Sequence, residues 1–252
     1  MTARLGLLGA VLLAACEAPT PRPGRAEATA DTTLALDLRG RTLVLDGTAG
    51  DVTLTADSSA TGATLVLTRR ARGATRASAA RRLAGVTVST AADDEMEQVV
   101  WRASPAEGAG VSARVTVPPD AHVVVHLDAG DVAARALVGP LDIETAIGAV
   151  RLDDHAGARL RVRVGSGTAT IGARTIPPAA LWFVSLGDGN GTVRLPPDAS
   201  ATVVATGDTL AMRGGAVTSR ERAGTGERRQ VRFGAGEAVV RVETARGRVT
   251  VR

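Results

Sequence analysis

The sequence predicts an all-β fold: a β-solenoid of roughly 18-residue coils with a small α/β insertion near its N-terminal end. Three observations predict it. From Asp31 onward, short runs of Val, Leu, Ile and Thr alternate with polar residues and are separated by Gly, Asp or Pro. Apolar positions recur nine residues apart, and single glycines precede many of them. Long segments with the apolar spacing of an amphipathic helix are absent.

Residues 1–15 have the features of a lipoprotein signal peptide. Arg4 is followed by a run of apolar or small residues that is too short to span a bilayer. Residues 13–16, Leu-Ala-Ala-Cys, resemble a bacterial lipobox, which implies cleavage before Cys16 and lipid attachment, palmitate included, at that residue. Cys16 is the only cysteine, so the exported domain has no disulfide. An ordinary signal peptide with a chance cysteine is the alternative.

Residues 16–30 predict a flexible tether. Pro19, Pro21 and Pro23 stand at alternate positions, which prevents helix and sheet. By analogy with known lipoprotein sorting, Glu17 after the modified cysteine favours the outer membrane. The domain that follows, residues 31–252, would then face the periplasm or the cell surface.

The nine-residue repeat of apolar positions predicts the coils. Two such units make one coil with two short strands and two corners, and glycine supplies the positive φ of a tight corner. Hairpins of an antiparallel meander or sandwich have the same period, so this arrangement stays open as the alternative. The repeat runs through Leu34, Leu43 and Val52, then Val123, Val132, Leu141, Val150, Leu160 and Ala169, then Val184 and Val193, and finally Val231, Val240 and Val249. The predicted structural turns are Gly50, Gly130, Gly148, Gly167, Gly191 and Gly247.

The stretch 69–111 departs from the repeat and predicts the insertion, which would cap or flank the end of the solenoid. Residues 74–83 predict a short helix ending at Gly85, and residues 86–90 and 98–103 predict strands joined by an acidic loop, Asp93–Glu97. Six arginines here are candidate contacts for anionic lipid headgroups or acidic glycans, and pairing with the acidic loop is the alternative. They are Arg69, Arg70, Arg72, Arg76, Arg81 and Arg82.

A longer repeat marks two joints. Residues 114–121 and 193–199 both carry a strand that ends in Pro-Pro-Asp-Ala, and each is followed by a β-branched run and then Gly-Asp. A proline pair followed by Asp ends a strand, so these segments predict joints between blocks of coils.

The strand ending in Val117 and the following Pro-Pro-Asp-Ala, together with Ala-Gly-Asp-Val at residues 129–132 and later Gly-x-Val units, resembles a bacterial domain-of-unknown-function family labelled "putative adhesin". The resemblance extends from Leu34 to Arg252. It implies a β-helical fold, a place in the cell envelope and a binding role.

The composition argues against two classes of binding protein, lectins and nucleic-acid-binding proteins. Aromatic residues make up 2% of the chain and Tyr is absent, so the stacking surfaces used for sugars or single-stranded bases can hardly be assembled. The net charge is only +4, and every basic residue is Arg. An exported, tethered protein is also not expected to meet nucleic acid.

Two groups of residues are candidate cation sites. His122 and His126 lie on one face of a predicted strand and could form a metal pair, with His155 in the acidic turn after Asp153 and Asp154 as a distant addition. Solvent-exposed polar residues explain all three histidines equally. Gly187–Gly191 is similar to calcium loops, but the motif is not repeated, so a tight turn is the better explanation.

Carboxylates are the candidates for glycan chemistry. Asp128 with Asp131, or Asp142 with Glu144, could stack on neighbouring coils, as general acid and base catalysis on a sugar requires. Paired acids on such a face are usually solvated. Ser166 lies between two glycines, but Val164 replaces the first glycine of a nucleophile elbow.

Together these observations predict a lipid-anchored envelope protein that binds or supports without catalysis and without a cofactor. The expected partners are the membrane, through Cys16, and an envelope protein or glycan. One alternative is a carbohydrate-active β-helix enzyme, which a deep groove lined by three or more carboxylates would favour. The other is an envelope-stress sensing module that acts through a partner protein.

Overall fold

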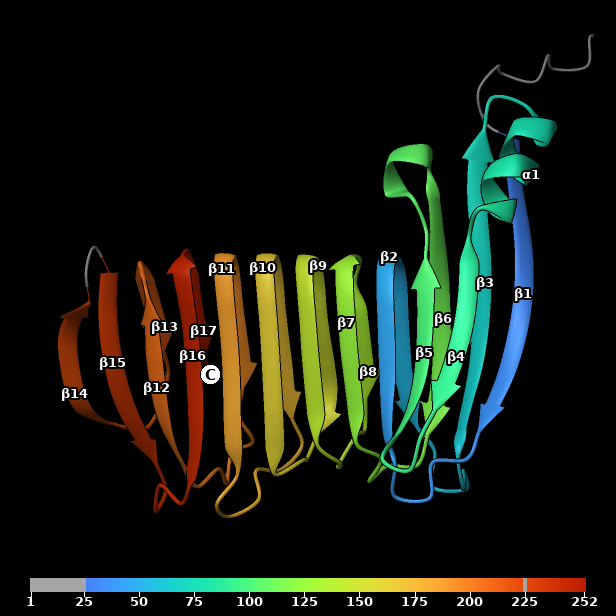
Figure 1. The fold of residues 1–252 in the computed structure, drawn as a ribbon. Helices are drawn as coiled ribbons and strands as arrows, with labels where there is room; N and C mark the ends of the chain where they lie inside the picture. The colour runs from blue at the N-terminus through green and yellow to red at the C-terminus, as the bar shows by residue number, and fades with distance from the viewer. Residues whose placement is uncertain (1–25, 224–225) are drawn as a thin grey trace, which may run out of the picture.

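The computed structural model describes residues 26–223 and 226–252, so Cys16, the predicted leader and most of the predicted tether lie outside the described residues. The described chain is all-β, as predicted, with one short helix, α1 (Arg76–Ala84), and one 3-10 turn, η1 (Pro105–Glu107). Its strands join in a single sheet system with parallel and antiparallel pairs (Figure 1). Among these residues no helix is long and apolar enough to cross a membrane.

The strands are β1 (Ala26–Leu36), β2 (Thr42–Ala56), β3 (Ala63–Gly73), β4 (Thr87–Ala92), β5 (Met96–Arg102), β6 (Ala109–Val117), β7 (Val123–Ala129), β8 (Val132–Arg135), β9 (Leu141–His155), β10 (Arg159–Ala173), β11 (Leu181–Arg194), β12 (Ala201–Gly207), β13 (Thr209–Met212), β14 (Ala216–Ala223), β15 (Gly226–Phe233), β16 (Ala238–Arg246) and β17 (Arg248–Val251).

Strands in the middle of the chain pair parallel, each with the strand 18 to 22 residues further along the chain. Val123 of β7 pairs with Leu141 of β9, Leu141 with Leu160 of β10, and Leu160 with Trp182 of β11. A straight strand as long as β9 would span about 50 Å. Its end is joined to β10 by three residues, which bridge at most about 15 Å, and β10 starts beside the start of β9. The strand must therefore fold back on itself, and each such unit, called a layer below, has a first arm and a second arm.

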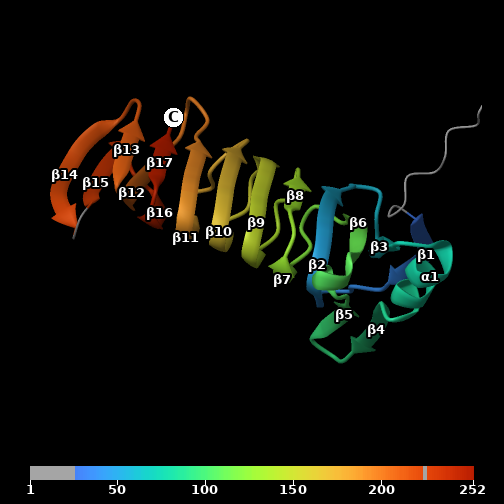
Figure 2. The same cartoon turned by 90° about the horizontal axis from the view of Figure 1, so that it is seen from above.

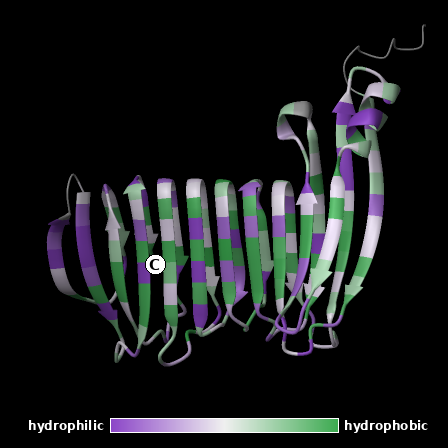
Figure 3. Cartoon of the chain, in the orientation of Figure 1, coloured by the Kyte–Doolittle hydropathy of each residue, from purple (hydrophilic) through white to green (hydrophobic). Residues whose placement is uncertain are grey.

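The core lies between the two arms. Along β9, Leu141 and Ile143 of the first arm and Val150 and Leu152 of the second arm are buried, while Asp142 and Arg151 between these pairs face outward. The view from above separates the arms, with β7 and β8 on opposite sides of the stack (Figure 2). Hydrophobic and hydrophilic bands accordingly alternate along the middle strands (Figure 3). Burial of this continuous core is the main stabilising contribution.

The two arms of the middle strands meet along the upper edge of Figure 1. Glycines of successive layers stack on one another at these corners. Gly148 has a φ of 155°, and a Cβ atom there would overlap the carbonyl oxygen of Gly130 in the layer beside it. The other corners repeat this contact: Gly130 lies against Gly50, Gly167 against Gly148, Gly189 against Gly167 and Gly247 against Gly189. In β11 the positive φ is at Gly189, two residues before the predicted Gly191.

Two layers are inserted out of chain order. β2 lies between β7 and β5, and β16 lies between β11 and β12. The two Pro-Pro-Asp joints are the connections that pass these layers: Pro118–Ala121 leads from β6 past β2 to β7, and Pro196–Ala199 leads from β11 past β16 to β12. Both joints close the same backbone turn, in which the alanine N–H donates to the first proline carbonyl. The layer that begins with β2, near the start of the chain, and the layer that begins with β16, near its end, are therefore each inserted where a joint connects two strands that are not neighbours.

Antiparallel strands cover the two ends of the stack. At the N-terminal end, β4 pairs with β5, β3 with β6 and β1 with β3, and α1 packs on β3 and β1. The predicted helix and the two predicted strands of the stretch 69–111 all lie in this end, as α1, β4 and β5. At the other end, the largely hydrophilic strands β15 and β14 continue the first-arm sheet from β12 (Figure 3).

Candidate functional site

The outward side chains of the first arms form a row across neighbouring layers. Asp46 of β2 is paired in register with His126 of β7, and the row continues through Glu144 of β9 and Arg163 of β10 to Ser185 of β11. Parallel register keeps equivalent positions side by side, so residues that are 18 or more positions apart become neighbours. We call this surface the first-arm face.

Acids on this face stack against arginines. A carboxylate oxygen of Glu144 lies 3.5 Å from Nη1 of Arg163, and one of Asp142 lies 3.6 Å from Nη1 of Arg161. The expected pairing of Asp142 with Glu144 on neighbouring layers is therefore wrong, because both lie on β9, two residues apart. Each acid instead has a cation as its neighbour in the next layer.

The second expected pair, Asp128 with Asp131, is separated by the corner at Gly130. Asp128 ends the outward row of β7, whereas the carboxylate of Asp131 accepts a hydrogen bond from the backbone N–H of Ala149 at 2.8 Å. Asp131 therefore joins one layer to the next at the corner.

A groove of about 560 Å³ runs through the first-arm face. Small residues, Ala146 and Gly165, leave the space, and polar side chains stand around it. Three carboxylates on consecutive layers line the groove, together with a histidine, an arginine and a serine: Asp46, Asp128, Glu144, His126, Arg163 and Ser185. The groove can accept hydrogen bonds from hydroxyl or amine groups and donate to anionic ones.

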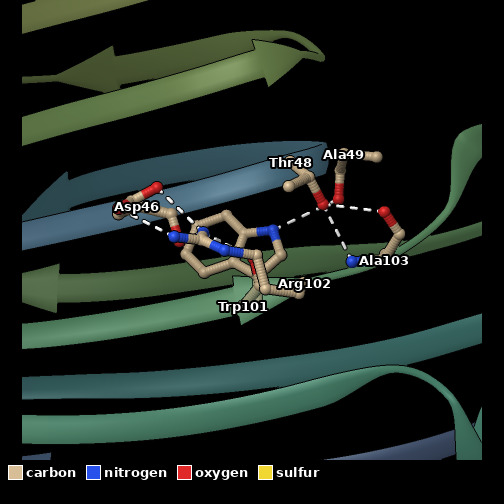
Figure 4. A network of polar contacts seen from close by, with 6 residues as sticks. All are labelled: Asp46, Thr48, Ala49, Trp101, Arg102 and Ala103. Carbon is tan, nitrogen blue, oxygen red and sulfur yellow. Dashed lines mark hydrogen bonds and ion pairs between the residues drawn. The ribbon is translucent and has the colours of Figure 1, made fainter.

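Asp46 is held in place by the neighbouring strand β5 (Figure 4). Arg102 donates from Nη1 and Nη2 to the two carboxylate oxygens of Asp46, at 3.0 and 3.2 Å. Thr48 Oγ1 bonds both the N–H and the carbonyl of Ala103 at 2.8 Å. The buried Trp101 donates from Nε1 to the Ala49 carbonyl at 3.2 Å. Trp101 and Arg102 of β5, with Ala103 directly after the strand, thus hold this part of β2, and Arg102 fixes Asp46 in the wall of the groove.

A second hollow of about 460 Å³ adjoins the row near the start of the first arms. Its lining includes His122, Asp142, Arg159, Arg161 and the exposed Leu181. Burial raises the pKa of Asp142 above its ordinary value, although the nearby His126 and Arg163 oppose this effect. The hollow therefore combines two arginines with an apolar side chain.

The three histidines do not meet. His122 Nδ1 lies 2.9 Å from the hydroxyl of Thr42, and His126 lines the groove. In the described part of the chain, no group of three His, Cys, Asp or Glu side chains is placed to hold a metal ion. Gly187–Gly191 is a corner in which Asp188 pairs with Arg246 and the side-chain oxygen of Asn190 accepts from the Arg248 N–H at 3.0 Å.

The interpretation of His155 as a solvent-exposed residue is wrong. Its side chain is 1% exposed and lies against Trp182, with ring centroids 5.2 Å apart. Asp154 has a φ of 58°, and the extra residue it adds after Leu152 turns His155 inward. Neither ring nitrogen makes a hydrogen bond of ordinary geometry, and burial lowers the pKa of His155 to about 4.

The six arginines of the predicted basic cluster divide between two elements. On β3, Arg70 pairs with Asp51 at 3.5 Å and Arg72 with Glu27 at 3.6 Å. Arg69 donates to the Val86 carbonyl at 3.4 Å. The remaining three, Arg76, Arg81 and Arg82, are exposed on α1.

Sequence reasoning missed four contributors to the first-arm face: Asp46, Arg102, Arg163 and Ser185. They belong to different strands, and only the pairing of layers brings them to the row that holds His126 and Glu144. The nine-residue repeat was an available signal for Arg163, because Glu144 and Arg163 each lie three residues after a repeat position, Leu141 and Leu160. It did not reach Arg102, which lies outside the repeat, or Ser185, where the repeat is displaced by two residues.

Comparison with known proteins gives a likeness of fold. No known protein family matches the sequence, and no curated protein matches it. The structure is similar to a crystal structure named as a putative cell adhesion protein from Clostridium sporogenes, with a TM-score of 0.50 and 10% identity over 89% of this chain and 99% of that one. A putative adhesin from Bacteroides fragilis has a TM-score of 0.33 and 11% identity over 91% of this chain and 99% of that one. The first likeness shows a common fold.

Proposed function

We propose that this protein is a lipid-anchored cell-envelope protein whose layers form a β-solenoid and whose first-arm face binds a partner without catalysis. The leader and the lipobox-like residues before Cys16 support the anchor. The shared fold with a protein named as a putative cell adhesion protein supports an adhesion-like role at the envelope. The palmitate-bearing anchor would hold the domain at the outer membrane, facing the periplasm or the cell surface.

The observation that carries the proposal is the row of polar side chains across five layers, from Asp46 to Ser185. It alternates acid and base, and it lies along a groove instead of a closed pocket. A long, mixed-charge surface of this kind suits an extended or flat partner, with charge complementarity setting specificity.

The test is crosslinking in intact cells, followed by mass spectrometry of what is attached. Arg163→Glu reverses a cation of the first-arm face, and Arg151→Glu is the matched control, because Arg151 is exposed on a second arm and pairs with Asp153 at 2.7 Å. We expect capture of the partner to fall in the first variant only. A captured protein would identify an assembly or stress-signalling module, and captured glycan would identify adhesion to carbohydrate. Equal capture by both variants would exclude the first-arm face.

The anchor has its own test. Cys16→Ser should abolish incorporation of labelled palmitate and shift the protein from the membrane fraction to the soluble fraction. Protease treatment of intact cells then distinguishes the cell surface from the periplasm. Unchanged labelling in the serine variant would refute lipid attachment at Cys16.

The three carboxylates of the groove favour a second candidate, cleavage of a glycan. General acid catalysis needs one protonated and one ionised carboxyl near the bond that breaks. Asp46 pairs with Arg102 at 3.0 Å, and Glu144 lies 3.5 Å from Arg163. Release of reducing ends from envelope glycans, lost in Glu144→Gln, would support the enzyme. Absence of turnover by the folded wild-type protein would leave the binding role.

A further inference from the structure

The helix α1 presents a surface of one charge sign. Its sequence, Arg-Ala-Ser-Ala-Ala-Arg-Arg-Leu-Ala, contains three arginines and no acid. Ala79 is buried and Leu83 half-buried, whereas Arg76 and Arg81 are exposed together with Ala77 and Ala80. Arg82 is also exposed and donates to the Arg72 carbonyl at 2.7 Å. Small side chains between the arginines leave the guanidinium groups accessible to a flat surface.

The acidic loop, which was the alternative partner for these arginines, lies elsewhere. β4 leads away from α1, and the loop follows at its far end, on the lower side of Figure 1, while α1 rises above the upper edge. Asp93 accepts from the backbone N–H groups of Glu95 and Met96, and Glu97 pairs with Arg41. Across residues 26–223 and 226–252, neither Arg76 nor Arg81 forms an ion pair.

The chain enters the domain beside this helix. The first described residue of β1, Ala26, pairs with Gly73, which lies two residues before Thr75, the N-cap of α1. Nine residues lie between Cys16 and Ala26, and the ten steps from one to the other span at most about 35 Å. Two of those residues are Arg22 and Arg25. If Cys16 carries lipid, as proposed above, the end of the molecule that bears α1 is the end held nearest the membrane.

We propose that Arg76 and Arg81 of α1 form a docking surface for the anionic phospholipid headgroups of the membrane that holds the anchor. Each arginine near such a surface raises the partition onto the membrane about fivefold, and the attraction fades within a Debye length of about 10 Å. The contact is too weak to hold the protein alone. Added to the anchor, it orients the domain with α1 toward the membrane and the C-terminal strands β14 and β15 away from it.

The test uses the exported chain from residue 16 with Cys16→Ser, which removes the lipid. Binding to phosphatidylcholine vesicles with and without phosphatidylglycerol is measured by co-sedimentation at low and raised salt. We expect salt-sensitive binding to the anionic vesicles only. The double variant Arg76→Glu, Arg81→Glu should weaken it by roughly 20-fold or more. The control, Arg174→Glu with Arg222→Glu, makes the same change in net charge at exposed positions outside α1 and should keep most of the binding.

Three results would overturn the proposal. Equal losses in the two double variants would mean that net charge alone attracts the protein to the vesicles. Equal binding to neutral vesicles would mean that headgroup charge is irrelevant. Binding to lipopolysaccharide or to an acidic peptide, with none to phosphatidylglycerol, would assign the arginines to another partner. Because the chain used here carries no lipid, these results are independent of the labelling of Cys16, which tests the anchor.

Discussion

The middle layers and the N-terminal end of the molecule both bury apolar side chains, but their strands pair differently. In the middle, Leu141 pairs with Leu160 in parallel register, and each strand folds back at a glycine. At the N-terminal end, β3 is an antiparallel partner of both β1 and β6, and β1 and β3 rise above the row of corners (Figure 1). The middle repeats one shape, whereas the end combines antiparallel strand pairs with one short helix.

This difference decides how each region tolerates change. At a corner, the space that a Cβ would need is occupied by the carbonyl oxygen of the neighbouring layer, so every layer depends on the backbone of the next. At the N-terminal end, α1 and β4 can shift without disturbing a column of contacts, because each contacts few other elements. Substitutions of similar size should therefore lower the stability most in the middle layers and least at the N-terminal end.

The largest effect is expected for Gly148→Ala. The new Cβ would overlap the carbonyl oxygen of Gly130, and a φ of 155° is strained for any residue with a side chain. We expect a loss of about 4 kcal/mol or more in the free energy of unfolding, measured by denaturant titration, or failure to fold.

The matched control is Gly110→Ala, which lies in β6 at the N-terminal end. A Cβ atom there would come no closer than 3.8 Å to its nearest neighbour, the Ala49 carbonyl oxygen, and its φ is not positive. The expected change is within about 1 kcal/mol. Similar losses in the two variants would contradict the idea that the glycine column makes the middle layers intolerant.

The next effect concerns His155, which lies inside the middle layers. Its folded pKa of about 4 is below the ordinary value of 6.5, so the unfolded chain binds a proton that the folded chain does not as pH falls through this window. The stability should therefore drop by about 3 kcal/mol between pH 6.5 and pH 4. His155→Leu removes the titrating group and should flatten this part of the pH profile, measured by denaturant unfolding at several pH values.

His126→Gln is the control for this profile. His126 is exposed in the groove, so its replacement should leave the steep fall below pH 6.5 in place. A His155→Leu protein with the same slope as the wild type would show that other groups cause the loss of stability in acid.

The nine-residue repeat predicted the layers correctly only where strands pair parallel. Leu43, Val123, Leu141 and Leu160 share one inward row, and Val52, Val132, Val150 and Ala169 share the row after the corner. After the longer connection to β11, the equivalent residues are Trp182 and Gly191, two positions before the predicted Val184 and Val193. Leu34 and Val231 fit the period but belong to antiparallel strands, where they pair with Leu65 and Val203.

The insertion of layers could not be read from the repeat. The period predicts which residues face inward, but it does not predict which layers are neighbours in the stack. The placement of β2 beside β7 joins residues 80 positions apart, such as Asp46 and His126, and so creates the first wall of the groove. The two Pro-Pro-Asp motifs were the only local sign that the chain leaves its regular path there.

A smaller effect is expected at the corner carboxylates. Asp131→Ala removes the acceptor of the Ala149 N–H and should cost about 1 to 2 kcal/mol, because a hydrogen bond to a charged acceptor is lost between two layers. Asp153→Ala is the matched control, since its ion pair with Arg151 lies on the surface and should be worth less than about 0.5 kcal/mol. Thermal unfolding of both variants measures the two losses of stability. Equal losses would show that the carboxylate of Asp131 does not stabilise the contact between layers.

The smallest effect is expected at the N-terminal end, in Thr75→Ala. Thr75 Oγ1 accepts from the Ser78 N–H at 3.1 Å, and the Ser78 hydroxyl accepts from the Thr75 backbone N–H at 2.9 Å, which together form a capping box. The substitution removes the first of these bonds and leaves the second, because alanine keeps its backbone N–H. The local cost is about 1 kcal/mol. Because α1 packs mainly on β1 and β3, the helix should open without the middle layers. Amide exchange should therefore speed up about fivefold in α1 and stay unchanged in β9 and β10. Faster exchange in both regions would show that the end and the middle unfold together.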